Sequence, residues 1–247
     1  MTAINFNYEI RSSFPPHPEG PATLGAKFLN TLDALSRVDP TVFYDWQVID
    51  LRAPPPLPLE SVRPRIAEII ESGVHRNDRE SPPEPLFGYN AAALTNNPIG
   101  SHRLTLIINA GGKVKGGYTW LQTGEWQVLP DPSIVTYPIF KTALLTINAN
   151  WPAPWACAYA YRKDYDTVPL IPGAPLFPSS IFAIPWMGYL SARLTTPFVL
   201  PPPEIQTERT PDGGLLMIAT EDRLDPTNPE HLRRARIIAK TMIDRTS

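Results

Sequence analysis

Apolar residues recur along the chain with two periods, and these periods predict where the helices and strands lie. Spacings of three and four residues predict helices over residues 24–39, 61–73, 137–149 and 229–242, and a short helix around Trp186, Leu190 and Leu194. Alternating runs predict strands over residues 43–51, 88–95, 102–110, 118–126 and 155–162. A hairpin follows, in which EIQTERT and LLMIATE are joined by the turn residues Pro211, Asp212, Gly213 and Gly214.

The order of these elements predicts the fold class. Helices do not alternate regularly with strands, which disfavours a parallel sheet built from strand–helix–strand units. We therefore expect an α+β fold, in which a mostly antiparallel mixed sheet carries flanking helices. The length of 247 residues fits one domain over residues 1–247, with residues 1–20 extended or partly disordered.

Proline is the unusual residue of the composition. The chain has 31 prolines, about two and a half times the usual share of roughly 5%. They cluster in FPPHPEGP (14–21), APPPLPLESVRP (53–64), SPPEP (81–85) and LPPP (200–203). Proline fixes φ and lacks an amide donor, so these clusters mark connections between elements.

Composition and charge narrow the class of protein. Apolar residues make up 43% of the chain and charged residues 19%, enough for a folded core. The net charge of −2 gives no global basic field, which argues against a dedicated nucleic-acid binder. Cys157 is the single cysteine and cannot close an intrachain disulfide, which fits a reducing cytoplasm. Neither an export signal nor a membrane-spanning stretch is indicated.

The stretch GGLLMIATEDRLDPTNPEH, residues 213–231, carries the densest group of acids near a helix start. Asn228, Pro229 and Glu230 supply a cap, a proline at the first helical position and an acid facing the helix dipole. Glu221 and Asp222, with Asp225, match no calcium-loop pattern, so turn chemistry accounts for them. His231 falls in the first turn of the helix and is expected to be partly exposed.

Other stretches that could carry chemistry fail on spacing or context. The loop GGKVKGG (111–117) lacks the GK[ST] element and lies between two predicted strands. The four histidines are far apart, and no GxSxG sequence occurs. Ser101 and His102 are adjacent on a predicted strand, where neighbouring side chains point apart. We therefore expect neither a catalytic residue, a cofactor nor a metal.

Three stretches of the carboxy-terminal third resemble one known family. They are PWMGYLSARL (185–194), PPP (201–203) and DGGLLMIATEDRLDPTNPEH (212–231), and they resemble the immunity protein 52 family of bacterial polymorphic-toxin systems. The amino-terminal helix and strand, with Phe28 and Trp46, resemble the family more faintly. The family pattern falls on Trp186, Gly188, Tyr189, Leu190, Gly214, Glu221, Asp225, Asn228, Pro229, Glu230 and His231. Pro185 departs from the pattern, because relatives often have glycine before the tryptophan.

The resemblance implies a cytoplasmic antidote that binds and blocks a cognate toxin. Such toxins are often restriction-endonuclease-like DNases, delivered between competing bacteria by a contact-dependent or type VI apparatus. An antidote needs a binding surface and no catalytic residues, which agrees with the absence of catalytic motifs. A DNase cleft is basic, so we expect exposed acids to meet it. The best local clusters are Asp164, Tyr165, Asp166, Glu221, Asp222 and Asp225.

Two functions from other classes stay open at this point. The first is a metal-dependent hydrolase whose site assembles around Glu221, Asp222 and His231. The second is a nucleic-acid-binding module that uses the last helix, with Trp120 or Trp126 for stacking. Arg233, Arg234, Arg236 and Lys240 lie away from the apolar stripe of that helix and would contact phosphates.

Overall fold

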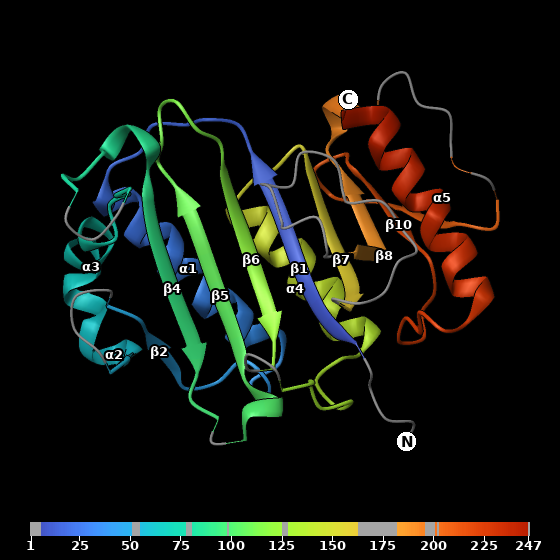
Figure 1. Cartoon of the computed structure of the whole chain (residues 1–247), viewed down its shortest axis with the longest axis horizontal. Coiled ribbons are helices and arrows are strands. Elements are labelled where there is room, and N and C mark those ends of the chain that lie inside the picture. Colours follow the sequence, from blue (N-terminus) through green and yellow to red (C-terminus); the bar gives the residue numbers. More distant parts are fainter. Residues whose placement is uncertain are drawn as a thin grey trace.

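The computed structural model describes residues 6–50, 55–77, 81–97, 99–124, 128–162, 182–195, 201 and 203–246. Ten strands of this part of the chain form one sheet in the order β3-β2-β4-β5-β6-β1-β7-β8-β10-β9, and every described pair is antiparallel (Figure 1). The predicted α+β class with an antiparallel sheet is confirmed in this respect.

The strands of the first half of the chain are β1 (Asn7–Phe14), β2 (Trp46–Val48), β3 (Leu57–Pro58), β4 (Tyr89–Thr95), β5 (Leu104–Ala110) and β6 (Gly117–Thr123). The second half contributes β7 (Trp155–Arg162), β8 (Phe182–Leu190), β9 (Gln206–Arg209) and β10 (Leu215–Ile218). Strands lie at the predicted ranges 88–95, 102–110, 118–126 and 155–162, and the predicted hairpin is present. The end of the third range, with Trp126, lies outside the described residues. The strand expected over 43–51 is shorter, since only Trp46–Val48 pair with a neighbour.

Helices cover both faces of the sheet. On one face, α1 (Pro21–Val38) and α4 (Tyr137–Asn150) pack against the strands, with α3 (Ile66–Ser72) beside α1. On the opposite face, α5 (Pro229–Thr246) packs on β8 (Figure 1). The core lies under α1 and α4, where Phe28 and Leu32 meet sheet residues such as Ile10 and Leu106, all fully buried. None of the described helices is both long and apolar enough to span a bilayer.

Two local predictions at the second helix were wrong. The helix expected over 61–73 is broken into α2 (Leu59–Val62), a 3-10 turn over Arg63–Arg65 and α3. Pro64 lies in that turn, where its missing amide and fixed φ favour the break. The sequence also suggests Ser61 as the cap of this helix, but Ser61 lies inside α2 and its hydroxyl donates to the carbonyl of Pro58.

Two strands of the sheet were not predicted as strands. Within the stretch expected to be extended or partly disordered, residues 7–14 form β1, which pairs with β6 and β7 near the middle of the sheet. The short helix expected around Trp186, Leu190 and Leu194 is the strand β8, followed by a single 3-10 turn, η4 (Ala192–Leu194). A strand buried on both faces is apolar at nearly every position, so its apolar residues also match a helical spacing.

Candidate partner-binding surface

The acidic crossing, residues Glu221 to Asp225, connects β10 to α5 at one edge of the sheet. Glu221, Asp222 and Asp225 are all exposed. The Asp225 carboxylate accepts hydrogen bonds from the Thr227 amide (2.8 Å) and hydroxyl (2.7 Å), and Glu221 accepts one from the Gln206 side chain (2.8 Å). These local contacts agree with the predicted turn chemistry. Within the described residues, no group of three or more His, Cys, Asp and Glu side chains could hold a metal ion.

The helix start after the crossing is built as the sequence indicates. Asn228 caps α5, because its side-chain oxygen accepts the amide of Glu230 at 2.9 Å, and Pro229 is the first helical residue. His231 is partly exposed, as expected, and its Nδ1 accepts the amide of Asp225 at 3.0 Å. That nitrogen is therefore engaged in holding the crossing to the helix.

Three of the four cations predicted on the outer face of α5 are paired with acids, and the fourth, Arg236, is exposed. Arg233 contacts Glu230 (2.8 Å) and Glu204 (2.9 Å), and Arg234 contacts Glu230 (2.8 Å). The hydrogen bond from Arg233, followed by that from Arg234, lowers the pKa of the Glu230 carboxyl to about 2. Lys240 pairs with Asp244 on the next turn. This arrangement does not favour the predicted contact with phosphates, because Arg233, Arg234 and Lys240 already have counterions.

The aromatic segment of β8 supports the fold around α5. The register of β7 and β8 shifts at Trp186, which packs at 5.3 Å between ring centroids against Phe140 and donates to the carbonyl of Thr220. Gly188 faces α5, and Leu190 is fully buried. Tyr189 faces α4's side of the sheet and donates to Asp212 at 2.5 Å.

Gly214 makes room for that tyrosine. A Cβ atom at this position would meet the Tyr189 ring at 2.6 Å and the Leu190 carbonyl at 2.8 Å. The glycine, tyrosine and tryptophan of the motif therefore all serve packing. Of the expected partner-contacting residues, Asp164, Tyr165 and Asp166 lie outside the described residues. The structure shows the crossing acids exposed at the surface and does not bring them together into a pocket.

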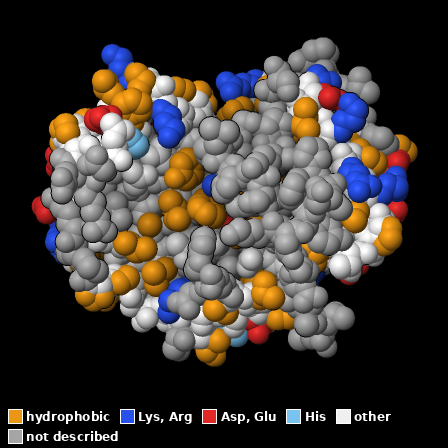
Figure 2. Space-filling view, in the orientation of Figure 1, with side chains coloured by type: hydrophobic (Ala, Val, Ile, Leu, Met, Phe, Trp, Pro, Cys, Tyr) orange, Lys and Arg blue, Asp and Glu red, His pale blue; other side chains and the backbone are white. Residues whose placement is uncertain are grey.

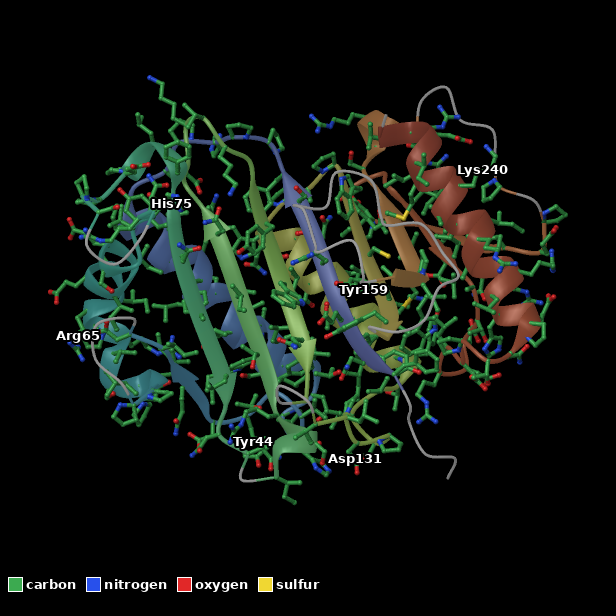
Figure 3. All side chains as sticks on the ribbon, in the orientation of Figure 1. Tyr44, Arg65, His75, Asp131, Tyr159 and Lys240 are labelled. Atoms are coloured by element: carbon green, nitrogen blue, oxygen red, sulfur yellow. The ribbon has the colours of Figure 1, made fainter. Side chains whose placement is uncertain are left out.

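A buried charged cluster on β1 was not predicted. The side chains of Glu9 and Arg11 lie on the sheet face opposite α1 and α4, and both are buried. The Tyr159 hydroxyl donates to the Glu9 carboxylate, and the Arg11 guanidinium lies over the Trp120 ring at 4.8 Å and over Tyr118 at 5.7 Å. Figure 3 shows Tyr159 on this face of the sheet.

Burial governs the ionisation of this cluster. It raises the pKa of the Glu9 carboxyl to about 7, against the opposing effects of the Tyr159 hydrogen bond and the Arg11 charge. Burial also lowers the pKa of Arg11. The stretch NYEIRSSF alternates between polar and apolar residues, and this alternation is the signal in the sequence that could have predicted the strand.

Farther along the same face of the sheet, apolar side chains gather over β4, β5 and β6, where Ala92, Ile107 and Trp120 are only half-buried (Figure 2).

Ser101 and His102 lie in a 3-10 turn, η3 (Gly100–His102), and not on a strand as predicted. Their side chains therefore meet, with 3.3 Å between the Ser101 hydroxyl and the His102 Nδ1. The Nε2 of His102 is 3.6 Å from Asp131, which is longer than a hydrogen bond. Asp131 itself accepts from the amide and hydroxyl of Ser133. This trio lacks the geometry of a proton relay.

Cys157 is fully buried on β7. Burial raises the pKa of its thiol, so the thiolate that a nucleophile needs is disfavoured. This agrees with a packing role.

Three comparisons with known proteins bear on this geometry. A sequence model of the family named Immunity protein 52 matches residues 122–246, which is slightly more than half of the chain. A search of curated sequences found no match. Among solved structures, the Pseudomonas aeruginosa T6SS protein PA0821 is similar in fold, with a TM-score of 0.54 at 10% identity over 96% of this chain and 73% of that chain. The family match includes β7 to α5 and the motif residues described above, and the chain belongs to the immunity protein 52 family.

Proposed function

We propose that this protein is an immunity protein that binds a cognate secreted toxin and neutralises it in the cytoplasm of the cell that carries both. The family match over residues 122–246 carries this proposal. The structural neighbour is a T6SS protein, which supports type VI secretion as the route of delivery. The proposed mode of action is binding without turnover.

We further propose that the toxin is a restriction-endonuclease-like DNase and that the acidic crossing contacts its basic cleft. Glu221 and Asp222 are exposed, and the crossing contains three acids against one arginine, Arg223, so it carries net negative charge. The nearby Arg233 and Arg234 of α5 are already paired with Glu230. A basic cleft would be attracted to this charge, and the attraction would raise the rate of association. Neutralising a nuclease that kills at few copies requires a complex near the tight limit of roughly −18 kcal/mol.

Co-expression tests the function directly. The toxin encoded beside this gene is expressed from an inducible promoter, with and without this protein in the same cells. We expect growth to be rescued only when this protein is present. Undiminished killing at matched expression levels would remove the immunity function.

The activity of the toxin is tested separately, with purified proteins. We expect the toxin to degrade DNA and this protein to stop the degradation at about one equivalent. Rescue of growth with a toxin that leaves DNA intact would keep the immunity function and remove the DNase assignment.

A calorimetric titration with divalent metal ions tests the metal-dependent hydrolase that the sequence left open.

A further inference from the structure

Two neighbouring cavities form a groove along the edge of the sheet where β1 and β8 end and β7 and β10 begin. Their volumes are about 300 Å³ and about 340 Å³, and both are lined by Pro15 and Pro152. We call this the edge groove. It lies at the upper edge in Figure 1, and β10 runs from this edge toward the acidic crossing at the opposite one. The two surfaces are therefore separate.

One end of the edge groove is lined by rings held in place. Phe14 and Trp151 stack with 6.1 Å between centroids and 20° between planes. The Trp151 indole N–H donates to the Thr31 hydroxyl at 2.8 Å, which fixes the orientation of the ring. Pro15 and Pro16 line the same end and are exposed. Because these rings are already held in place, little entropy is lost when a ligand binds beside them. This favours binding of an apolar ring side chain of a partner.

The other end of the edge groove offers hydrogen-bond donors. Asp212, the acid at this end, already accepts from the Thr210 hydroxyl (2.5 Å), the Tyr189 hydroxyl (2.5 Å) and the Gly214 amide (3.3 Å). Burial alone would raise the pKa of the Asp212 carboxyl, but these hydrogen bonds outweigh it and lower the pKa. The acid is thus satisfied within the protein.

Two donors at the same end have no such partners. Arg193 is exposed and makes no hydrogen bond or ion pair within the described chain. The Ser191 hydroxyl is buried, and among described residues it has no hydrogen-bond partner. A buried hydroxyl without a partner costs about 1–3 kcal/mol, so a ligand that pairs with it gains affinity. A guanidinium beside a hydroxyl complements a carboxylate.

We propose that the edge groove binds an extended acidic segment of the toxin, with a ring side chain in the Phe14–Trp151 slot and a carboxylate on Arg193 and Ser191. The assignment of the segment to the toxin rests on the proposed function. Charge supports an acidic segment, because Glu19, the acid that lines the ring end, is already paired with Lys27. Beside this end, Lys113 and Lys115 are exposed on the hairpin that adjoins Gly111. The family motif takes part here indirectly, since Tyr189 and Gly214 donate hydrogen bonds to the Asp212 carboxylate, which lines this end.

The test measures binding of the purified toxin to full-length variants by biolayer interferometry. Arg193→Glu and Pro16→Glu place a negative charge at the two exposed ends of the edge groove, where each would repel an acidic segment. Arg65→Glu is the matched control, because Arg65 is an exposed arginine on the far side of the molecule (Figure 3). Melting temperatures confirm that each variant is folded.

We expect each groove variant to weaken toxin binding by tenfold or more, and we expect the control to bind like the wild type. A milder change, Ser191→Ala, should weaken binding by several fold. If the wild type binds the toxin and Arg193→Glu binds equally well, the groove proposal is wrong and the immunity function stands. If the wild type does not bind the toxin, both are wrong.

Discussion

Gly188 of β8 lies directly against Met242 of α5, so close that a Cβ atom at position 188 would stand 2.6 Å from the methionine sulfur. The same Cβ atom would stand 2.8 Å from the Cγ2 of Ile238. Real contacts of this kind are longer, so the missing side chain is what lets the last helix pack on the sheet. A motif position of the family is thus explained by helix packing.

We predict that Gly188→Ala destabilises the fold by about 1–3 kcal/mol, because the added methyl group forces α5 outward. Urea denaturation measures the change. Met242→Ala alone also costs stability through the cavity it leaves. The double variant should lose less than the sum of the two single losses, because the truncated side chain frees the space that the alanine needs. Strictly additive losses would contradict this account.

The cap of α5 gives a second prediction. Asn228→Ala removes the oxygen that accepts the Glu230 amide, and we expect a loss of about 1 kcal/mol in the free energy of unfolding. Thr136→Ala is a matched control, because Thr136 occupies the N-cap position of α4 without a side-chain hydrogen bond. The control should lose clearly less. Equal losses would show that the hydrogen bond contributes little.

Most of the fold could be predicted from the sequence, and the failures have physical causes. The helix over Pro21–Val38 has one buried face, and the spacing of its apolar residues identifies it. The hairpin of β9 and β10 is identified by its turn residues. The strand β8 has two buried faces, and no period separates it from a helix. The strand β1 was missed because Glu9 and Arg11 suggest an exposed face, although the sheet buries both.

The candidate site was less predictable than the fold. The local chemistry from Asp225 to His231 is contained within seven consecutive residues, so the sequence indicated the cap and the turn correctly. The edge groove combines Phe14, Trp151 and Arg193, which are distant in sequence and meet only because three loops end at one edge. No single stretch could have indicated it.

The buried carboxyl of Glu9 predicts a pH dependence of stability. Its pKa rises from 4.5 in the unfolded chain to about 7 in the fold, which corresponds to about 3 kcal/mol. Because the neutral form is favoured in the fold, this contribution is complete below pH 4.5 and is lost as the pH rises through 7. We expect Glu9→Gln to be more stable than the wild type at pH 8 and close to it at pH 4.5.

Urea denaturation at a series of pH values between 4.5 and 8 measures this effect. Glu230→Gln is the control, since the pKa of Glu230 is lowered to about 2 and its own contribution changes only at lower pH. The control should therefore follow the wild-type slope over this range. A Glu9→Gln variant with the wild-type slope would show that Glu9 stays charged in the fold.

The acidic crossing gives the last prediction, which concerns the rate of toxin binding. Glu221→Lys with Asp222→Lys reverses two exposed charges while leaving Asp225, whose carboxylate holds the turn, in place. If the toxin presents a basic face, the association rate should fall about tenfold at low salt, and its dependence on salt should weaken. Glu68→Lys with Glu71→Lys, at exposed positions of α3, controls for the same change in net charge. The dissociation rate should change little, because rim charges act on encounter more than on the packed contact. An unchanged association rate and an unchanged salt dependence in the double variant would place the toxin on another surface, and would leave the edge groove to account for binding.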